Sequence, residues 1–254
     1  MGGVRRGDVA VVTGAASGIG RRLAMALHEL GLLVIGVDRD SSGLTDVVGS
    51  KAAVCDLSDT DAFVELLAGI EREHGRVDLL ANLAGIEAPL RAVGASLEPY
   101  LTVMGVNFLA PAAGTLQVLP GMVDRSRGFV VNCSSDSVRS PIAHDSPYVS
   151  SKGALSAFSE SVAAEVRSAG VHVHVLYPGF VETAMGRRAL DRGMKRPPKC
   201  VLRTVEQVSD AVLDRLGGPS VDINAAPMGA LIPLIKAMAP PLYRKVMAGR
   251  EIPV

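Results

Sequence analysis

The sequence predicts one α/β domain with a doubly wound parallel sheet of about seven strands and helices on both faces. Six short runs rich in β-branched residues are apolar on both alternations, as in strands buried on two faces. Longer segments with helical periodicity separate these runs, and such alternation is typical of parallel sheets with right-handed crossovers. A chain of 254 residues, 48% of them hydrophobic, can bury one large core but is short for two enzyme domains. We therefore interpret residues 1–254 as one domain.

The predicted strands and helices follow one another along the chain. Each strand run carries apolar residues on both faces, and the segments between runs place apolar residues at helical spacing. The predicted strands are 9–13, 32–37, 52–55, 77–80, 129–132 and 171–176. The predicted helices are 19–30, 59–74, 99–123, 148–169 and 205–216.

The helix predicted at 99–123 raises the question of a membrane span, because its 25 residues include no charged or His side chain. Asn107, Gln117 and three prolines would leave polar or unpaired groups in hydrocarbon. We therefore expect a helix buried on most sides, partly at a subunit interface, and no integral membrane segment. A homo-oligomer, either a dimer or a tetramer, is the corresponding expectation.

Charge and cysteine content exclude several function classes. The chain has 26 basic and 26 acidic residues, so no global field recruits nucleic acid. Cys55, Cys133 and Cys200 are odd in number and widely spaced, which fits reduced thiols and excludes a disulfide scaffold. His172 and His174 lie on one strand face without a third ligand, so we expect no metal site. The N-terminus shows no apolar segment of signal-peptide type, which predicts a cytoplasmic protein.

A glycine-rich turn joins the first predicted strand to the first helix in the order Thr13-Gly14-Ala15-Ala16-Ser17-Gly18-Ile19-Gly20. Gly14 suits a positive φ, Gly18 allows close approach of a pyrophosphate, and Gly20 allows the helix to pack on the strand. The helix N-terminus adds free N–H groups and positive dipole. This context predicts a Rossmann-like phosphate-binding loop.

Asp38 closes the second predicted strand, 18 residues after Gly20. A carboxylate at about this offset accepts hydrogen bonds from both hydroxyls of an adenosine ribose and repels a 2′-phosphate, which favours NAD as cofactor. The adjacent Arg39 is able to receive a 2′-phosphate, so NADP stays open. Asp56, after the third strand, has two equal interpretations: contact with the adenine, or capping of the next helix by Asp56 or Ser58.

Tyr148 and Lys152 are spaced i and i+4 at the start of a predicted helix, so their side chains project from one face. At an effective dielectric constant of ~20, a positive charge ~5 Å away favours phenolate by ~3 kcal/mol. We therefore expect Lys152 to lower the pKa of Tyr148 toward neutrality, which suits a general acid and base.

These residues together resemble the short-chain dehydrogenase/reductase family, in order from Asp8 to Thr183. The family's TGxxxGIG turn matches Thr13 to Gly20, and its NNAG segment matches Asn82-Leu83-Ala84-Gly85. Its helix asparagine is similar to Asn107, and its serine to Ser135, 13 residues before Tyr148. Its YxxxK and PGxxxT motifs match Tyr148 with Lys152 and the segment Pro178 to Thr183.

The resemblance implies an NAD-dependent oxidoreductase acting on secondary alcohols or ketones. It implies that Tyr148 exchanges the proton, Ser135 steadies the substrate oxygen, Lys152 holds the nicotinamide ribose, and Asn107 anchors a proton-relay water. The cofactor-binding residues that it implies are Gly14, Ser17, Gly18, Ile19, Gly20, Asp38, Asp56, Leu57, Asn82, Ala84, Gly85, Tyr148, Lys152, Pro178, Gly179, Val181 and Thr183. An NAD-binding regulatory protein, or an epimerase or dehydratase on the same fold, is the alternative.

Two features depart from the family pattern. Leu83 replaces the second asparagine of NNAG, so a hydrogen bond between neighbouring strands is missing or replaced. After Val221-Asp222 the chain continues into an apolar tail, 225–254, punctuated by proline.

The segment after PGxxxT, 182–200, is predicted to fold over the substrate as a lid. It contains six basic residues and two acidic ones. An apolar or bulky alcohol enclosed by lid and tail is favoured over an anionic substrate steered by the arginines. The direction of the reaction and the identity of the substrate stay open.

Overall fold

The computed structural model describes residues 3–45, 47, 51–247 and 252–254. Seven parallel strands form the main sheet in the order β3-β2-β1-β4-β5-β6-β9. The strands are β1 Val9–Thr13, β2 Leu33–Asp38, β3 Lys51–Val54, β4 Leu79–Asn82, β5 Gly128–Cys133, β6 Val171–Tyr177 and β9 Asp222–Asn224. The predicted doubly wound sheet is confirmed, and every predicted strand lies within two residues of an observed one.

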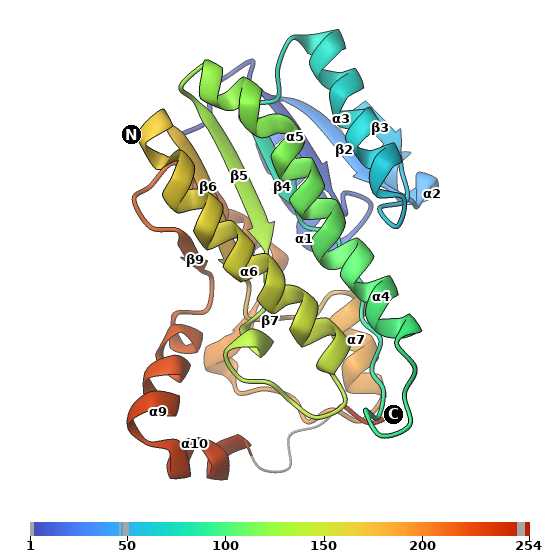
Figure 1. Cartoon of the computed structure of the whole chain (residues 1–254), viewed down its shortest axis with the longest axis vertical. Helices are drawn as coiled ribbons and strands as arrows, with labels where there is room; N and C mark the ends of the chain where they lie inside the picture. Colours follow the sequence, from blue (N-terminus) through green and yellow to red (C-terminus); the bar gives the residue numbers. More distant parts are fainter. Residues whose placement is uncertain (1–2, 46, 48–50, 248–251) are drawn as a thin grey trace.

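Helices cover both faces of this sheet, which forms the middle layer of three (Figure 1). Helix α1 (Gly18–Glu29) packs against α8 (Val205–Arg215) on one face. The other face carries α3 (Thr60–His74), α5 (Ala110–Asp124) and α6 (Ser146–Val166). A short α2 (Ser41–Thr45) precedes β3 and was not predicted.

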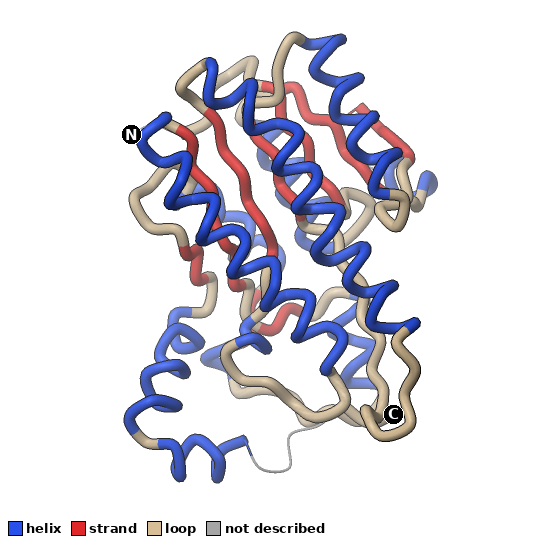
Figure 2. Tube along the Cα trace, viewed as in Figure 1, coloured by secondary structure: helices blue, strands red, loops and turns tan. Residues whose placement is uncertain are grey.

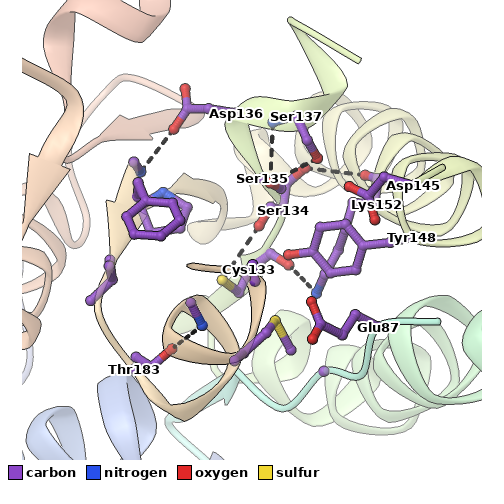
Figure 3. A pocket seen from close by; sticks show the side chains of 18 of the residues that line it. Glu87, Cys133, Ser134, Ser135, Asp136, Ser137, Asp145, Tyr148, Lys152 and Thr183 are labelled. Carbon is purple, nitrogen blue, oxygen red and sulfur yellow. Dashed lines mark hydrogen bonds between the residues drawn. The ribbon is translucent and has the colours of Figure 1, made fainter. Parts of the chain in front are cut away.

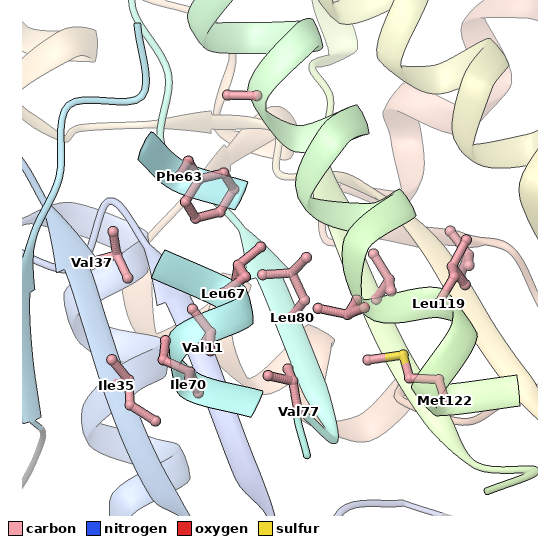
Figure 4. Packing of buried hydrophobic residues seen from close by; sticks show 14 of the residues in the cluster. Val11, Ile35, Val37, Phe63, Leu67, Ile70, Val77, Leu80, Leu119 and Met122 are labelled. Atoms are coloured by element: carbon pink, nitrogen blue, oxygen red, sulfur yellow. The ribbon is translucent and has the colours of Figure 1, made fainter. Parts of the chain in front are cut away.

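The core consists of two apolar clusters, one on each side of the sheet. Along β1, Val9 and Val11 belong to one cluster, while Ala10 and Val12 belong to the other. This alternation follows from the two-residue period of a strand, and it explains why the strand runs are apolar throughout. Figure 4 shows the first cluster, in which Phe63 and Leu67 of α3 pack onto the sheet.

The predicted helix 99–123 is present but interrupted. The chain forms α4 (Glu98–Met104), a π-helical turn η1 (Gly105–Leu109) and then α5. By length and composition Glu98–Asp124 is able to cross a membrane, and half of its most apolar stretch is buried inside the fold. The helix contacts α3 and α6, which suits a core helix. The expected absence of an integral membrane segment remains a prediction.

Beyond the carboxyl ends of the strands lie the lid segment and the tail (Figures 1 and 2). The lid segment contains α7 (Ala184–Asp191) and a 3-10 turn η4 (Lys199–Val201). A small parallel pair, β7 (Phe180–Val181) with β8 (Leu202–Arg203), holds the two ends of this segment together and was not predicted. The tail forms η5 (Pro227–Leu231), α9 (Ile232–Met238) and α10 (Pro240–Met247).

Candidate active site

The glycine-rich turn connects β1 to α1 at the carboxyl edge of the sheet. Gly14 has φ +71°, and a Cβ there would lie 2.9 Å from the backbone nitrogen of Ala84. A Cβ on Gly20 would lie 2.3 Å from the carbonyl oxygen of Gly14. The N-cap residue Ser17 makes no side-chain hydrogen bond to the helix, so its hydroxyl group is available to a ligand. Glycine at these positions creates a cradle that fits a pyrophosphate.

Asp38 ends β2 beside this turn. Its Oδ2 accepts a hydrogen bond from the Ala16 nitrogen at 3.2 Å, and its Oδ1 accepts one from the Asp40 nitrogen at 3.1 Å. The two bonds fix the carboxylate next to the glycine loop, where a ribose is expected. Arg39 lines the same cavity, so the structure keeps both candidate groups at this end.

Asp56 and its neighbour Leu57 also line the cavity. Asp56 Oδ1 accepts a hydrogen bond from the Ser58 nitrogen at 2.9 Å, and hydrogen bonds from Ser58 lower the pKa of Asp56. The helix that follows is capped instead by Asp59, whose side chain accepts a hydrogen bond from the Ala62 nitrogen. The capping interpretation of Asp56 or Ser58 is therefore wrong, and adenine contact by Asp56 remains a prediction.

A cavity of about 1090 Å³ runs from the glycine loop to the lid and tail. Of the seventeen predicted cofactor residues, sixteen line it, and so do the predicted catalytic residues Ser135, Tyr148 and Lys152. The fold therefore gathers predicted residues that lie up to 169 positions apart, from Gly14 to Thr183, around one cavity. Asn82 and Asn107 are absent from its wall.

Asn82, predicted to bind cofactor, is a buried tie between strands. Its Nδ2 donates a hydrogen bond to Asn132 Oδ1 at 2.8 Å, which joins β4 to β5. Thr13 Oγ1 accepts hydrogen bonds from the backbone nitrogens of Leu83 and Ala84. Leu83 replaces an asparagine whose side chain would have joined neighbouring strands. Asn82 and Thr13 supply hydrogen bonds between strands in its place. The amide nitrogen of Asn82 is thus engaged by Asn132 and Pro111, and the predicted contact of Asn82 with the cofactor remains a prediction.

Asn107 lies in the π-helical turn and is fully buried. Its Oδ1 accepts a hydrogen bond from the Ile86 nitrogen, and its Nδ2 donates to the Ile86 oxygen and to Ser151 Oγ. These contacts fix the loop after β4 against α6, next to Lys152. Both Nδ2 hydrogens are used by protein atoms, and the predicted water-anchoring role of Asn107 remains a prediction.

Tyr148, Lys152 and Ser135 meet where β5 and α6 approach each other (Figure 3). Lys152 Nζ donates a hydrogen bond to the Cys133 carbonyl oxygen at 2.7 Å and lies 5.8 Å from the centre of the Tyr148 ring. Ser135 Oγ accepts hydrogen bonds from the nitrogen and the hydroxyl of Ser137. Its own hydroxyl hydrogen therefore remains for Tyr148 or a substrate oxygen.

The electrostatics of this group differ from the expectation. Burial raises the pKa of Tyr148 above its ordinary value, and a hydrogen bond with Ser135 opposes this. Burial also lowers the pKa of Lys152. The expected lowering of the Tyr148 pKa by Lys152 is not found, because desolvation of the buried phenol is the largest effect and raises its pKa.

The segment from Pro178 to Thr183 contributes to the wall of the cavity that Tyr148 also lines. Gly179 has φ +77°, and its nitrogen donates a hydrogen bond to Asp136 Oδ2 at 2.8 Å. Thr183 caps α7 by accepting a hydrogen bond from the Gly186 nitrogen. Asp136, which the sequence analysis missed, thus fixes this segment to the start of the Ser135 loop.

Two further carboxylates that the sequence analysis missed, Glu87 and Asp145, line the cavity near Tyr148. Glu87 pairs with two lid cations, Arg192 at 2.9 Å and Arg188 at 3.6 Å. Burial and the nearby Glu87 carboxylate raise the pKa of Asp145 to about 7, and Arg192 acts in the opposite direction. The only sequence feature that pointed to Glu87 and Asp145 was their position in loops next to the matched motifs.

Within the described ranges, no group of three or more His, Cys, Asp or Glu side chains is arranged to hold a metal ion.

Comparisons with known proteins agree with this geometry. A family model described as short chain dehydrogenase matches residues 8–192. The chain belongs to the short-chain dehydrogenase/reductase family. It is 33% identical to dehydrogenase/reductase SDR family member 7B of Danio rerio, over 95% of this chain and 85% of that protein. It is 38% identical to a short chain dehydrogenase of Pseudocercospora fijiensis, over 72% of this chain and 63% of that protein.

Solved structures of short-chain dehydrogenase/reductases share the fold. A short-chain dehydrogenase from Streptomyces avermitilis superimposes with a TM-score of 0.80 at 25% identity, covering 96% of this chain and 98% of that chain. A metagenomic short-chain oxidoreductase in complex with NADP gives a TM-score of 0.70 at 30% identity, covering 82% and 89%. The chain is therefore an oxidoreductase of this family with a cradle for a nicotinamide cofactor.

Proposed function

We propose that this short-chain dehydrogenase/reductase moves a hydride between NAD(H) and a secondary alcohol or ketone, with Tyr148 as the acid and base. The observation that carries the proposal is the shared cavity, in which Ser135, Tyr148 and Lys152 lie on the wall that continues into the glycine loop. A bound nicotinamide cofactor would supply the hydride acceptor or donor. The residues of the chain supply position, hydrogen bonds and the proton.

The contacts of Ser135 and Tyr148 suit a substrate oxygen. Ser135 accepts two hydrogen bonds from Ser137, so its hydroxyl hydrogen is available to donate to that oxygen. Because burial raises the pKa of Tyr148, its phenol stays protonated at neutral pH and is ready to donate the proton to a ketone oxygen. Lys152 is held at the end of β5 by its hydrogen bond to Cys133, and its Nζ lies 5.8 Å from the centre of the Tyr148 ring.

NAD is proposed over NADP because Asp38 is held beside the glycine loop by two backbone N–H groups. A 2′-phosphate placed there would meet a carboxylate that cannot swing away without losing both hydrogen bonds. The preference for NAD needs its own test for two reasons. Arg39 lines the same wall, and a structural neighbour was solved in complex with NADP.

An apolar or bulky substrate is proposed from the far wall of the cavity. Met185 and Met194 of the lid segment and Ile232, Ile235 and Leu242 of the tail line it. Several lid cations already have partners: Arg192 pairs with Glu87, and Arg196 pairs with Glu182. Paired cations steer an anionic substrate less than free ones, so the apolar side chains dominate recognition.

The proposal is tested by following the nicotinamide absorbance with NAD(H) and a panel of secondary alcohols and ketones. We expect turnover with bulky apolar members of the panel, and this turnover should be nearly independent of salt and of the substitution Arg187→Ala, which removes a lid cation of α7. A steep salt dependence would contradict the apolar substrate. NAD binding without turnover of any panel member would favour the regulatory alternative, and isomerisation without net NADH formation would favour the epimerase.

A further inference from the structure

Large apolar side chains are exposed along the C-terminal helices. Of the fifteen such side chains exposed in the described part of the chain, six lie between residues 228 and 242. Their exposed fractions range from 41% to 77%, for Met228, Leu231, Leu234, Ile235, Met238 and Leu242. Solvent exposure of so many large side chains in one short segment is unfavourable unless a partner covers them.

The charges of the same segment have one sign. Residues 223–247 contain Lys236, Arg244 and Lys245 and no acidic residue. Lys236 lies 5.5 Å from the centre of the Tyr243 ring, which joins α9 to α10. An apolar segment whose own charged side chains are all cationic matches the boundary between acyl chains and anionic headgroups of a membrane.

The exposed surface is continuous with the candidate active site. Met228, Ile235 and Leu242 are exposed to solvent and also line the cavity that contains Tyr148. Figures 1 and 2 show α9 and α10 projecting beyond the carboxyl ends of the strands, away from the layers of the sheet domain. Apolar side chains therefore lead from the outer face of α9 and α10 into the cavity.

We propose that η5, α9 and α10 form an interfacial segment that docks on an anionic lipid surface and presents the cavity mouth to it. A second copy of the chain is a poorer occupant, because pairing this face with itself brings three cations against three. Insertion across the bilayer is excluded by length: at ~1.5 Å per residue, the apolar run Pro227–Met238 spans far less than ~30 Å of hydrocarbon. The segment lies on the membrane rather than through it.

The direct test is co-sedimentation of the full chain with vesicles of phosphatidylcholine alone and of phosphatidylcholine with phosphatidylserine. We expect binding to the mixed vesicles, at least tenfold weaker binding to the neutral ones, and loss of binding as salt is raised. The double variant Leu234→Ser/Met238→Ser should reduce the partition coefficient at least tenfold. Neither residue lines the cavity, so turnover of a water-soluble substrate should stay near wild type.

A matched control uses two exposed valines far from the tail in sequence, Val54→Ser/Val93→Ser, which are 63% and 96% exposed. This control should sediment with vesicles like wild type. Lys236→Gln/Lys245→Gln should remove the preference for anionic vesicles while retaining the fold, as judged by circular dichroism.

Three results would overturn the proposal: no sedimentation of wild type with either vesicle, equal sedimentation of the Leu234/Met238 variant, or conversion of an oligomer to a monomer by that variant. The last is read by light scattering after size exclusion, and it would assign the face to a second copy. Vesicle binding needs no turnover, so its failure is distinguishable from failure of the proposed oxidoreductase activity.

Discussion

Lys152 donates a hydrogen bond from Nζ to the carbonyl oxygen of Cys133 at 2.7 Å, and this contact ties α6 to the end of strand β5. The ammonium group is buried, and its nearest aromatic neighbour is the Tyr148 ring at 5.8 Å. The hydrogen bond to β5 thus fixes the position of the Lys152 ammonium group, and burial keeps the neighbouring Tyr148 a neutral phenol.

Tyr148→Phe should lower kcat at least a hundredfold, because it removes the proposed proton donor and keeps the ring. NAD affinity should stay within about threefold of wild type, since the substitution removes only a hydroxyl and alters none of the phosphate cradle. Steady-state kinetics and calorimetric titration with NAD measure the two quantities. Activity above about a tenth of wild type, a loss below ~1.4 kcal/mol, would contradict the role of Tyr148.

Asp38→Asn should reduce the preference for NAD over NADP by about tenfold in kcat/KM. Asn keeps an acceptor for the Ala16 or Asp40 nitrogen but removes the charge that opposes a 2′-phosphate. Paired assays with both cofactors give the ratio. A wild type that already prefers NADP would refute the assignment of Asp38 and make Arg39 the cofactor-reading residue.

Gly20→Ala should weaken NAD binding more than tenfold and destabilise the fold by about 1–3 kcal/mol, because the new methyl would lie 2.3 Å from the Gly14 carbonyl oxygen. Gly69→Ala is the matched control, since its Cβ would meet only the end of the Arg72 side chain at 3.8 Å. Thermal unfolding with and without NAD compares them. Equal behaviour of the two variants would show that the close packing of the loop is unimportant.

Glu87→Gln should loosen the lid, because Glu87 is 10% exposed and pairs with Arg192 and Arg188. Tryptic cleavage within residues 182–200 should accelerate about fivefold, equivalent to ~1 kcal/mol of lid closure. The substrate KM should rise while kcat changes less. Glu65→Gln breaks an exposed pair with Arg72 and serves as control; an unchanged cleavage pattern in Glu87→Gln would exclude the latch.

Asp145→Asn should flatten the pH dependence of stability. The folded pKa of Asp145 is about 7, above the unfolded value of ~3.9, so the fold binds the proton more tightly. This contribution is fully present below pH ~4 and is lost as pH rises through about 7, costing wild type on the order of 2 kcal/mol between pH 5 and 7.5. Urea unfolding at several pH values should show a smaller decline in the variant. Parallel curves for the two proteins would refute the burial of an uncompensated carboxyl group.

Local chemistry explains why most elements could be predicted. A strand buried on two faces has to be apolar on both alternations, and β1 was therefore recognisable at its observed bounds, Val9–Thr13. The glycine loop was recognisable because close backbone approach excludes any Cβ at Gly20. By contrast, the π-helical turn at Asn107 depends on contacts of that side chain with Ile86 and Ser151, which no periodicity encodes.

The sequence by itself determined the alternating α/β order, the family and most of the motif residues that gather at the cavity, because each depends on residue type and spacing along the chain. Only the tertiary structure decided the electrostatics and the partners. Desolvation of Tyr148 raises the tyrosine pKa where a lowering was expected, and burial is a property of the whole fold. The pairing of Glu87 with Arg192, 105 positions away, and the hydrogen bond of Asn82 to Asn132 likewise arise from contacts between distant segments.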